Sequence, residues 1–178
     1  MTDRIALGAS DLAWALDRAR AQTLALVADV PPEAMRLQAA PGERHPAWLL
    51  GHLLLADTYL LSLLEVEPLN HDFRKLLDLH GPASAPDGHT DYDAKPQLVD
   101  RLTRANALRV ARVAAMGERD YARSMPDAFL AQAQPTMGHH LQSLVFHEGY
   151  HSGQLSSWRR AHGFAAVAWQ LGPPPNGG

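Results

Sequence analysis

Four long segments of this chain carry apolar residues at every third or fourth position, and this spacing limits the folds open to it. The segments run from about Ser10 to Ala28, Pro46 to Val66, Ala94 to Met116 and Thr136 to His162. Residues three and four apart share one face of a helix, so each segment predicts an amphipathic α-helix. None shows the strict alternation that is typical of a strand. We therefore predict an all-α protein built as a single four-helix bundle.

The connections between these segments predict short helical turns and loops. A helical turn is expected in PPEAM (31–35), a short helix within residues 67–81, and one turn within residues 126–135. The bundle should occupy residues 1–165. Residues 166–178 are expected to form an irregular tail, because they are rich in proline and glycine.

Composition excludes several classes of protein. The absence of cysteine rules out disulfides, thiolate metal sites and a cysteine nucleophile. A net charge of −3, with both signs interspersed, offers no basic surface for nucleic acid or an anionic membrane. No apolar run is long enough to cross a membrane, and the first residues do not form a signal peptide. We expect a cytoplasmic protein with a small-molecule substrate, no nucleic-acid partner and no membrane association.

Ten residues of the chain are histidines, and three of them fall within apolar helical stripes. His147 and His151 lie one turn apart in the last segment, and His52 lies in a similar stripe of the second. A buried polar group without a partner costs about 1 to 3 kcal/mol. Histidines at i and i+4 can bind one metal ion, and a third from a facing helix would leave a position open, as in catalytic sites. The alternative is that each is a core histidine hydrogen-bonded to a neighbour.

The other histidines are predicted to lie outside this triad. His140, one heptad before His147, is about 11 Å away along the helix and could line the mouth of the site. Tyr59 and His140 are the candidates for a substrate contact or a general acid or base. His139 should point away from that face. The rest are expected in solvated loops or helix ends: His45, His71, His80, His89 and His162.

Residues 147–151, HEGYH, match the H-E-x-x-H motif of zinc proteases, but the remainder of the protease pattern is missing. No Asp or Glu follows Glu148 to act as a downstream ligand. The extended motif would require Gly and His where Gln154 and Ser157 stand. We therefore reject the protease interpretation, and we predict that Glu148 is a carboxylate on the helix surface.

Two further features concern helix surfaces. Gly149 and Gly153 are unfavourable inside a helix, by about 1 kcal/mol each against alanine. They predict the close approach of another helix, either within the bundle or across a dimer interface. The arginines of the third segment are expected on its more solvated positions: Arg101, Arg104, Arg109 and Arg112.

Two motifs resemble those of the DinB/YfiT-like superfamily of metal-binding four-helix bundles. The pattern H-x-x-x-H-x-G-Q, formed by His147, His151, Gly153 and Gln154, is similar to the family's motif in the last long helix. HPAWLLGHLLLAD, which contains His52, resembles the family's P-x-x-W-x-x-x-H-L element, although here only one residue separates proline from tryptophan. The preceding APGER is similar to the family's lead-in loop. The resemblance covers most of the chain.

This resemblance implies an up-down-down-up bundle in which His52, His147 and His151 hold a divalent ion. Zinc or nickel is expected, with iron, copper and manganese as alternatives. Better-understood relatives are transferases or isomerases that use bacillithiol, mycothiol or glutathione, so the resemblance favours a metal-dependent thiol S-transferase in detoxification or stress response, acting as a homodimer. The alternatives are a metal-dependent hydrolase that uses the same triad and a metal-binding stress protein without turnover. The family often has arginine after the second histidine of the motif, where this chain has Ser152.

Overall fold

The computed structural model describes residues 8–66, 73–86, 91–170 and 172, and the regular structure within them is helical. The four long helices are α1 (Ala9–Ala28), α2 (Pro46–Leu63), α4 (Lys95–Ala114) and α6 (Met137–Ala161). The short elements are η1 (Pro32–Arg36), α3 (Phe73–His80), α5 (Glu118–Ala122) and η2 (Leu130–Gln132). The prediction of an all-α fold is confirmed.

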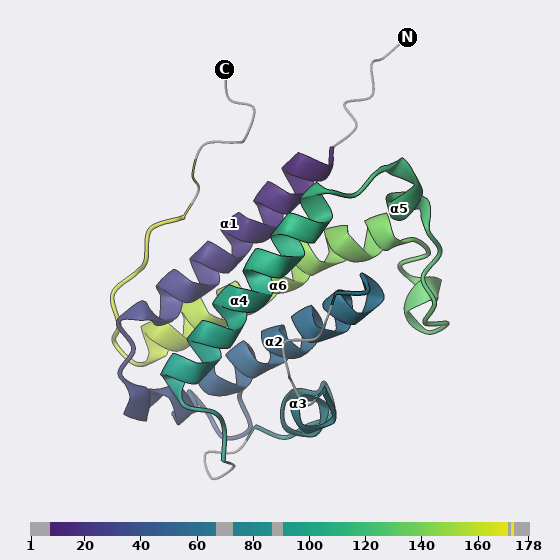
Figure 1. Ribbon diagram of the computed structural model, residues 1–178. Coiled ribbons are helices and arrows are strands. Elements are labelled where there is room, and N and C mark those ends of the chain that lie inside the picture. Colours follow the sequence, from purple (N-terminus) through teal and green to yellow (C-terminus); the bar gives the residue numbers. More distant parts are fainter. Residues whose placement is uncertain (1–7, 67–72, 87–90, 171, 173–178) are drawn as a thin grey trace.

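The long helices form an up-down-down-up bundle, in which α1 and α6 run in one direction and α2 and α4 in the other (Figure 1). α1 packs against α4 and α6, and α2 packs against α4, α6 and the short helix α3. This arrangement brings α2 and α6 into contact. The two segments that carry the inward-facing histidines therefore meet, although they lie far apart in the sequence.

The ends of α2 and α6 follow local signals in the sequence. Pro46 occupies the first turn of α2, and the Nδ1 atom of His45 caps this helix by accepting a hydrogen bond from the Trp48 amide at 3.2 Å. The Thr136 side chain caps α6. Gly163 adopts a φ of +75°, in the left-handed region that commonly ends a helix. Both histidine-bearing helices thus begin at residues that specify their starts.

The core of the bundle consists of two apolar clusters with a charged layer between them. One cluster surrounds Trp48 and Leu102, and the other surrounds Leu16 and Leu141. Between the clusters, each long helix contributes one buried charged side chain: Arg20, Asp57, Arg109 and Glu148. The interior is therefore apolar at both ends and ionic in the middle.

The four charged side chains of this layer neutralise one another. Arg20 donates to both oxygens of Glu148 and, at 2.8 Å, to Asp57. Arg109 donates to Asp57 at 2.7 Å and to Glu148 at 3.0 Å. Each carboxylate thus binds both guanidinium groups, and the layer has no net charge. Satisfied pairing of this kind is what makes buried charge tolerable.

The predicted positions of Glu148 and Arg109 were wrong. Both were expected on solvated helix faces, and both are only 1% exposed. Glu148 does point away from His147, but that side of α6 faces α1 and α4 rather than solvent, because α6 has neighbours on two sides. Arg109 follows the buried Ala105 by one helical turn and so continues the inner face of α4.

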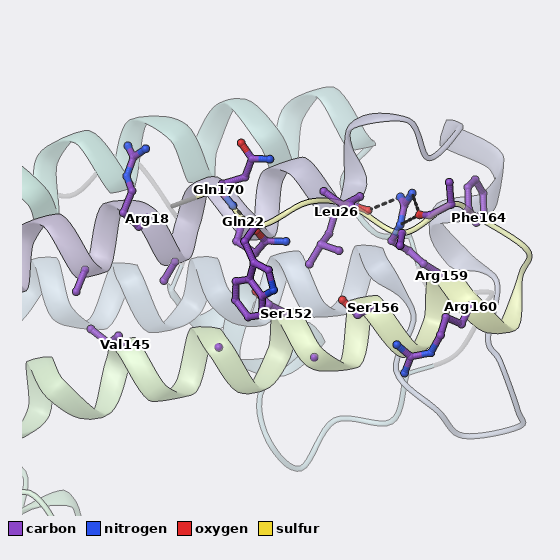
Figure 2. A pocket seen from close by; sticks show the side chains of 18 of the residues that line it. Arg18, Gln22, Leu26, Val145, Ser152, Ser156, Arg159, Arg160, Phe164 and Gln170 are labelled. Carbon is purple, nitrogen blue, oxygen red and sulfur yellow. Dashed lines mark hydrogen bonds between the residues drawn. The ribbon is translucent and has the colours of Figure 1, made fainter. Parts of the chain in front are cut away.

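The segment after α6 runs back along α1 and borders a cavity of about 580 Å³ between α1 and α6 (Figure 2). Residues 164–170 have no regular secondary structure. Arg159 fixes the start of the segment by donating to the carbonyl oxygen of Ala165 at 2.6 Å. Near its end, the amide of Gln170 donates to the side chain of Gln22 on α1 at 2.8 Å.

Gly149 and Gly153 make no close contact with another helix in the described part of the chain. A Cβ atom added at either position would meet no atom within 4 Å, and both residues are exposed. The expectation of a close approach within the bundle is therefore wrong. Their role in a dimer interface stays a prediction.

Among the described residues, α2 is the one helix long and apolar enough to cross a membrane. Of the window that meets this criterion, 72% is buried inside the bundle. The apolar character of α2 is thus accounted for by its central place in the core.

Candidate metal site

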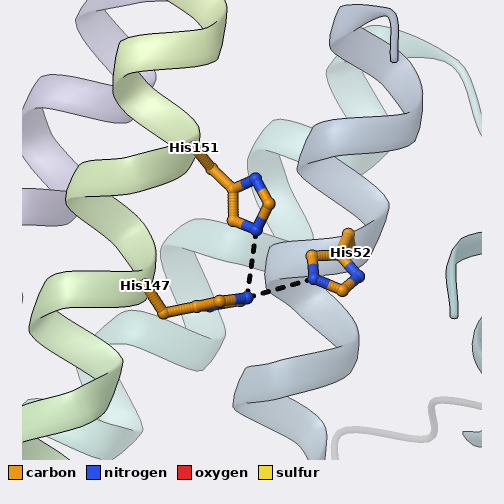
Figure 3. Close-up of side chains that lie close together, drawn as sticks. All are labelled: His52, His147 and His151. Atoms are coloured by element: carbon orange, nitrogen blue, oxygen red, sulfur yellow. Dashed lines mark hydrogen bonds between the residues drawn. The ribbon is translucent and has the colours of Figure 1, made fainter. Parts of the chain in front are cut away.

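The structure brings the three predicted ligands together where α2 meets α6. His52 extends from α2 toward His147 and His151, which lie one turn apart on α6 (Figure 3). The Nε2 atom of His147 is 3.1 Å from that of His52 and 3.0 Å from that of His151. One ring nitrogen from each of the three residues lies within 4.8 Å of the others. His151 is buried, whereas His52 and His147 are half-buried, so the cluster lies at the edge of the bundle.

The ring of His52 is oriented by the end of α3. Its Nδ1 atom donates to the backbone carbonyl of His80 at 2.7 Å. The ring also stacks on Trp48, with centroids 4.8 Å apart and planes 13° from parallel. His80 lies this close because residue 51 is glycine: a Cβ atom there would fall 2.0 Å from the His80 ring. Gly51 thus allows α3 to place a carbonyl group behind its neighbour His52.

The ring of His151 is oriented from within its own helix. Its Nδ1 atom donates to the side-chain oxygen of Gln154 at 2.7 Å, and the Gln154 amide donates to the Tyr150 hydroxyl at 3.4 Å. Histidine ligands of metals usually make such a hydrogen bond through the second ring nitrogen, which fixes both the tautomer and the ring direction. The G-Q letters of the sequence motif therefore acquire a structural meaning: Gln154 orients His151.

These contacts leave lone pairs pointing into the centre of the triad. A carbonyl oxygen only accepts hydrogen bonds, so His52 and His151 carry their protons on Nδ1 and present bare Nε2 atoms. A proton on the Nε2 atom of His147 can be donated to only one of these two Nε2 atoms. At least one of the two short nitrogen–nitrogen contacts therefore joins lone pair to lone pair, an arrangement that a cation would stabilise.

The electrostatic environment keeps the triad neutral near pH 7. Burial lowers the pKa of all three histidines, to about 4 for His147 and His151. The neighbouring imidazoles lower the pKa values of His147 and His151 further, because protonating one ring disfavours a second charge beside it. Metals bind neutral imidazole, so the site does not have to lose a proton before it binds an ion.

The donor set fits a divalent transition metal. Zinc–nitrogen bonds are about 2.0 to 2.1 Å long, which places two nitrogens on a tetrahedral ion about 3.3 Å apart. The two short pairs of the triad already approach this spacing. Three nitrogen ligands without a fourth protein ligand are typical of sites that keep a position for water or substrate.

Tyr59 and His140, the candidate substrate contacts, lie together one heptad along the same helix interface. Their rings meet edge to face, with centroids 6.0 Å apart. His140 is buried and donates from Nδ1 to the side-chain oxygen of Gln134 at 2.6 Å, and its buried Nε2 atom has no hydrogen-bond partner among the described residues. His140 thus offers a free acceptor, and its role in binding or catalysis stays a prediction.

Two of the histidines expected in solvent are buried. His45 caps α2, and the Nδ1 atom of His80 contacts the backbone oxygen of Trp48 at 3.2 Å. Their positions in loops or at helix ends were predicted, but their burial there was not. His139 is exposed, as expected, and His162 is half-buried against Trp158. His71 and His89 lie outside the described residues.

Fold and site together define an all-helical bundle with three histidines converging between its second and last long helices. A family model described as the DinB superfamily matches residues 15–155, and the chain belongs to this superfamily. A crystal structure of a conserved protein from Enterococcus faecalis shares the fold, with a TM-score of 0.65. The two sequences are 21% identical, and the match covers 88% of this chain and 98% of the other. No curated protein matches the chain.

Proposed function

We propose that this protein is a divalent-metal-dependent enzyme that transfers a low-molecular-weight thiol to an electrophile, in detoxification or stress response. The observation that carries the proposal is the convergence of three neutral imidazole nitrogens, two of them oriented by carbonyl oxygens behind the ring. Membership of the DinB superfamily supports it, since the sequence motifs resemble those of metal-binding relatives. Zinc or nickel is the expected ion.

In this proposal the residues of the chain have separate tasks. His52, His147 and His151 hold the ion, while the His80 carbonyl and Gln154 fix the direction of two of the rings. A bound ion would supply Lewis acidity, which favours the deprotonated, nucleophilic form of a thiol or of water. A thiol substrate makes the enzyme a transferase, whereas water makes it a hydrolase.

His140 bears on the choice between these two reactions. Its unpartnered Nε2 atom is an acceptor on the same helix as two of the ligands, and burial lowers the pKa of this histidine. It therefore stays neutral and able to accept a proton near pH 7. Hydrolysis requires a proton acceptor for water. His140 lies about 11 Å from His147 along α6, so it would act through intervening water, and this feature favours a hydrolase as the second candidate function.

Metal analysis of purified variants tests the first part of the proposal. We expect about one equivalent of zinc or nickel in the wild-type protein and only traces in His151→Ala. His139→Ala is the matched control, because His139 is an exposed histidine on the same helix. Equal metal content in all three proteins would refute the assignment of the triad.

An activity assay tests the second part. The protein is incubated with 1-chloro-2,4-dinitrobenzene and, in turn, bacillithiol, mycothiol and glutathione, and conjugate formation is measured. We expect conjugation with at least one thiol, loss of activity after chelation, and recovery when the metal is restored. Metal-dependent ester hydrolysis without thiol dependence would favour the hydrolase instead. Stoichiometric metal without either reaction would favour a metal-binding stress protein.

A further inference from the structure

An arginine without a counter-ion lies next to the candidate metal site. Arg44 precedes α2, and its guanidinium lies over the Trp48 ring at 4.3 Å from the ring centroid. The same Trp48 ring stacks on His52. Within the described part of the chain, Arg44 has neither a salt-bridge nor a hydrogen-bond partner, and its Nε atom is buried. Stacking therefore fixes the position of Arg44 while its charge stays uncompensated.

The lack of a counter-ion is significant because other positive charge gathers here. A divalent ion held by three neutral imidazoles brings two positive charges, and the amino-terminal end of α2 adds the positive end of a helix dipole. Among the described residues the buried carboxylates are Asp57 and Glu148, and both are already neutralised by Arg20 and Arg109. The site thus has an excess of positive charge that a bound anion would relieve.

We propose that Arg44 forms a carboxylate-binding subsite beside the metal centre, which selects a thiol cosubstrate carrying a carboxylate group. This inference rests on the proposed function and adds the chemical class of the cosubstrate. A guanidinium binds a carboxylate through two parallel hydrogen bonds, and the two Nη groups of Arg44 donate to no other described residue, whereas its Nε atom is shielded from solvent. The sulfur would reach the open side of the triad, and the carboxylate would pair with Arg44.

A groove that Arg44 lines borders the residues around His151, although none of the three histidines lines it. It has a volume of about 730 Å³, and its walls include Arg44, Tyr150 and Gln154. Gln154 binds His151, and the Tyr150 ring lies 5.1 Å from the His151 ring, so this wall belongs to the structure around the triad. Glu43 also lines the groove, but it is exposed, so it is a weak counter-ion for Arg44.

The test uses two thiols that differ in one group. Metal-free protein is loaded with Co²⁺, whose absorption spectrum reports thiolate binding, and is titrated with 3-mercaptopropionate or 2-mercaptoethanol. We expect the carboxylate thiol to bind at least about tenfold more tightly, which corresponds to one charge-assisted hydrogen bond. Arg44→Met, which keeps an apolar stem over Trp48, should remove this preference without weakening 2-mercaptoethanol. Glu43→Gln is the control and should retain the preference or increase it.

Each other outcome has a definite meaning. Equal affinity of the two thiols for the wild-type protein would overturn the subsite. A uniform loss for both thiols in Arg44→Met would also overturn it, because Arg44 would then only support the fold. If Co²⁺ binds but neither thiol does, the thiol-transfer proposal fails. The subsite is then tested by comparing the affinities of imidazole-4-acetate and 4-methylimidazole, which bind the metal through the same imidazole ring and differ in the carboxylate. Tighter binding of imidazole-4-acetate that is lost in Arg44→Met would support the subsite, and equal binding would overturn it. Failure to bind Co²⁺ would refute both proposals.

Discussion

Replacing Glu148 by glutamine should strongly destabilise the bundle. Glu148 accepts hydrogen bonds from Arg20, from Arg109 at 3.0 Å and from Thr23 at 3.0 Å, and it is 1% exposed. Glutamine keeps the shape but removes one negative charge, which leaves the layer with two arginines and one carboxylate. Its NH₂ group also turns a donor toward an arginine or Thr23. Breaking a buried ion pair from one side costs about 3 to 5 kcal/mol.

This loss would be a large share of the stability of a single domain, which is typically about 5 to 15 kcal/mol. The free energy of unfolding is measured by urea titration with circular dichroism. Asp100→Asn is the matched control, since it removes an exposed carboxylate from its pair with Arg104, and we expect it to cost less than about 1 kcal/mol. A loss below about 1 kcal/mol in Glu148→Gln would refute the view that this layer is buried and fully paired.

Three further predictions follow from the same structure. Gly51→Ala should weaken metal binding by about 10- to 100-fold in calorimetric titrations, because its Cβ displaces His80 and the carbonyl that orients His52. Metal-free protein should lose stability as the pH falls below about 6.5. Histidines of the unfolded chain are protonated from about pH 6.5 downward, whereas His147 and His151 of the folded protein have pKa values of about 4. The protein should lose further stability below about pH 4.5. Burial alone would raise the pKa of Glu148, but Arg20 and Arg109 lower it to about 2, so the unfolded chain takes up this proton at a higher pH than the folded protein does. Urea midpoints across this pH range check both parts. Zinc at 100 times its Kd should stabilise the wild-type protein by about 2.7 kcal/mol, and His151→Ala by much less.

The triad could be predicted from the sequence because helical spacing decides it. His147 and His151 are four residues apart between leucines, and His52 interrupts the most apolar segment of the chain. The resemblance to a known family then implied that the helix with His52 lies beside the helix with His147 and His151. Nothing beyond periodicity and that pairing was needed to bring the rings together.

The ionic layer was missed although its members also follow core spacing. Arg20 lies four residues after the buried Leu16, and Asp57 lies three residues before the buried Leu60. Arginine and glutamate are normally assigned to solvent, and one such residue on an inner face is ambiguous. The missed signal was the coincidence of two positive and two negative residues on the inner faces of four helices.

The support of His52 by His80 could not be predicted for a different reason. It depends on how the short helix α3 packs across α2, and the connections around α3 contain little periodic pattern. Gly51 is the one local hint, since glycine within a leucine-rich helix suggests a close neighbour. The sequence does not specify which neighbour that is.

The ionic layer and the metal site are linked through the rotation of α6 about its axis. His147 and His151 face α2, while Glu148 and Ser152, each one residue later, face α1. Successive residues differ by about 100° around a helix, so the contacts of Glu148 fix the direction of the histidines beside it. Buried polar groups can specify one arrangement even where they add little stability.

We therefore expect stability and metal affinity to separate when the whole layer is made apolar. The combined variant would replace Arg20 and Arg109 by methionine, and Asp57 and Glu148 by leucine. Its free energy of unfolding should stay close to the wild-type value or exceed it, because apolar residues of similar volume often replace buried ion pairs without loss. Metal affinity should fall at least about tenfold, because α6 would no longer be fixed in rotation. Calorimetric titration with zinc measures this, and an unchanged affinity in a stable variant would show that α6 is oriented by apolar packing alone.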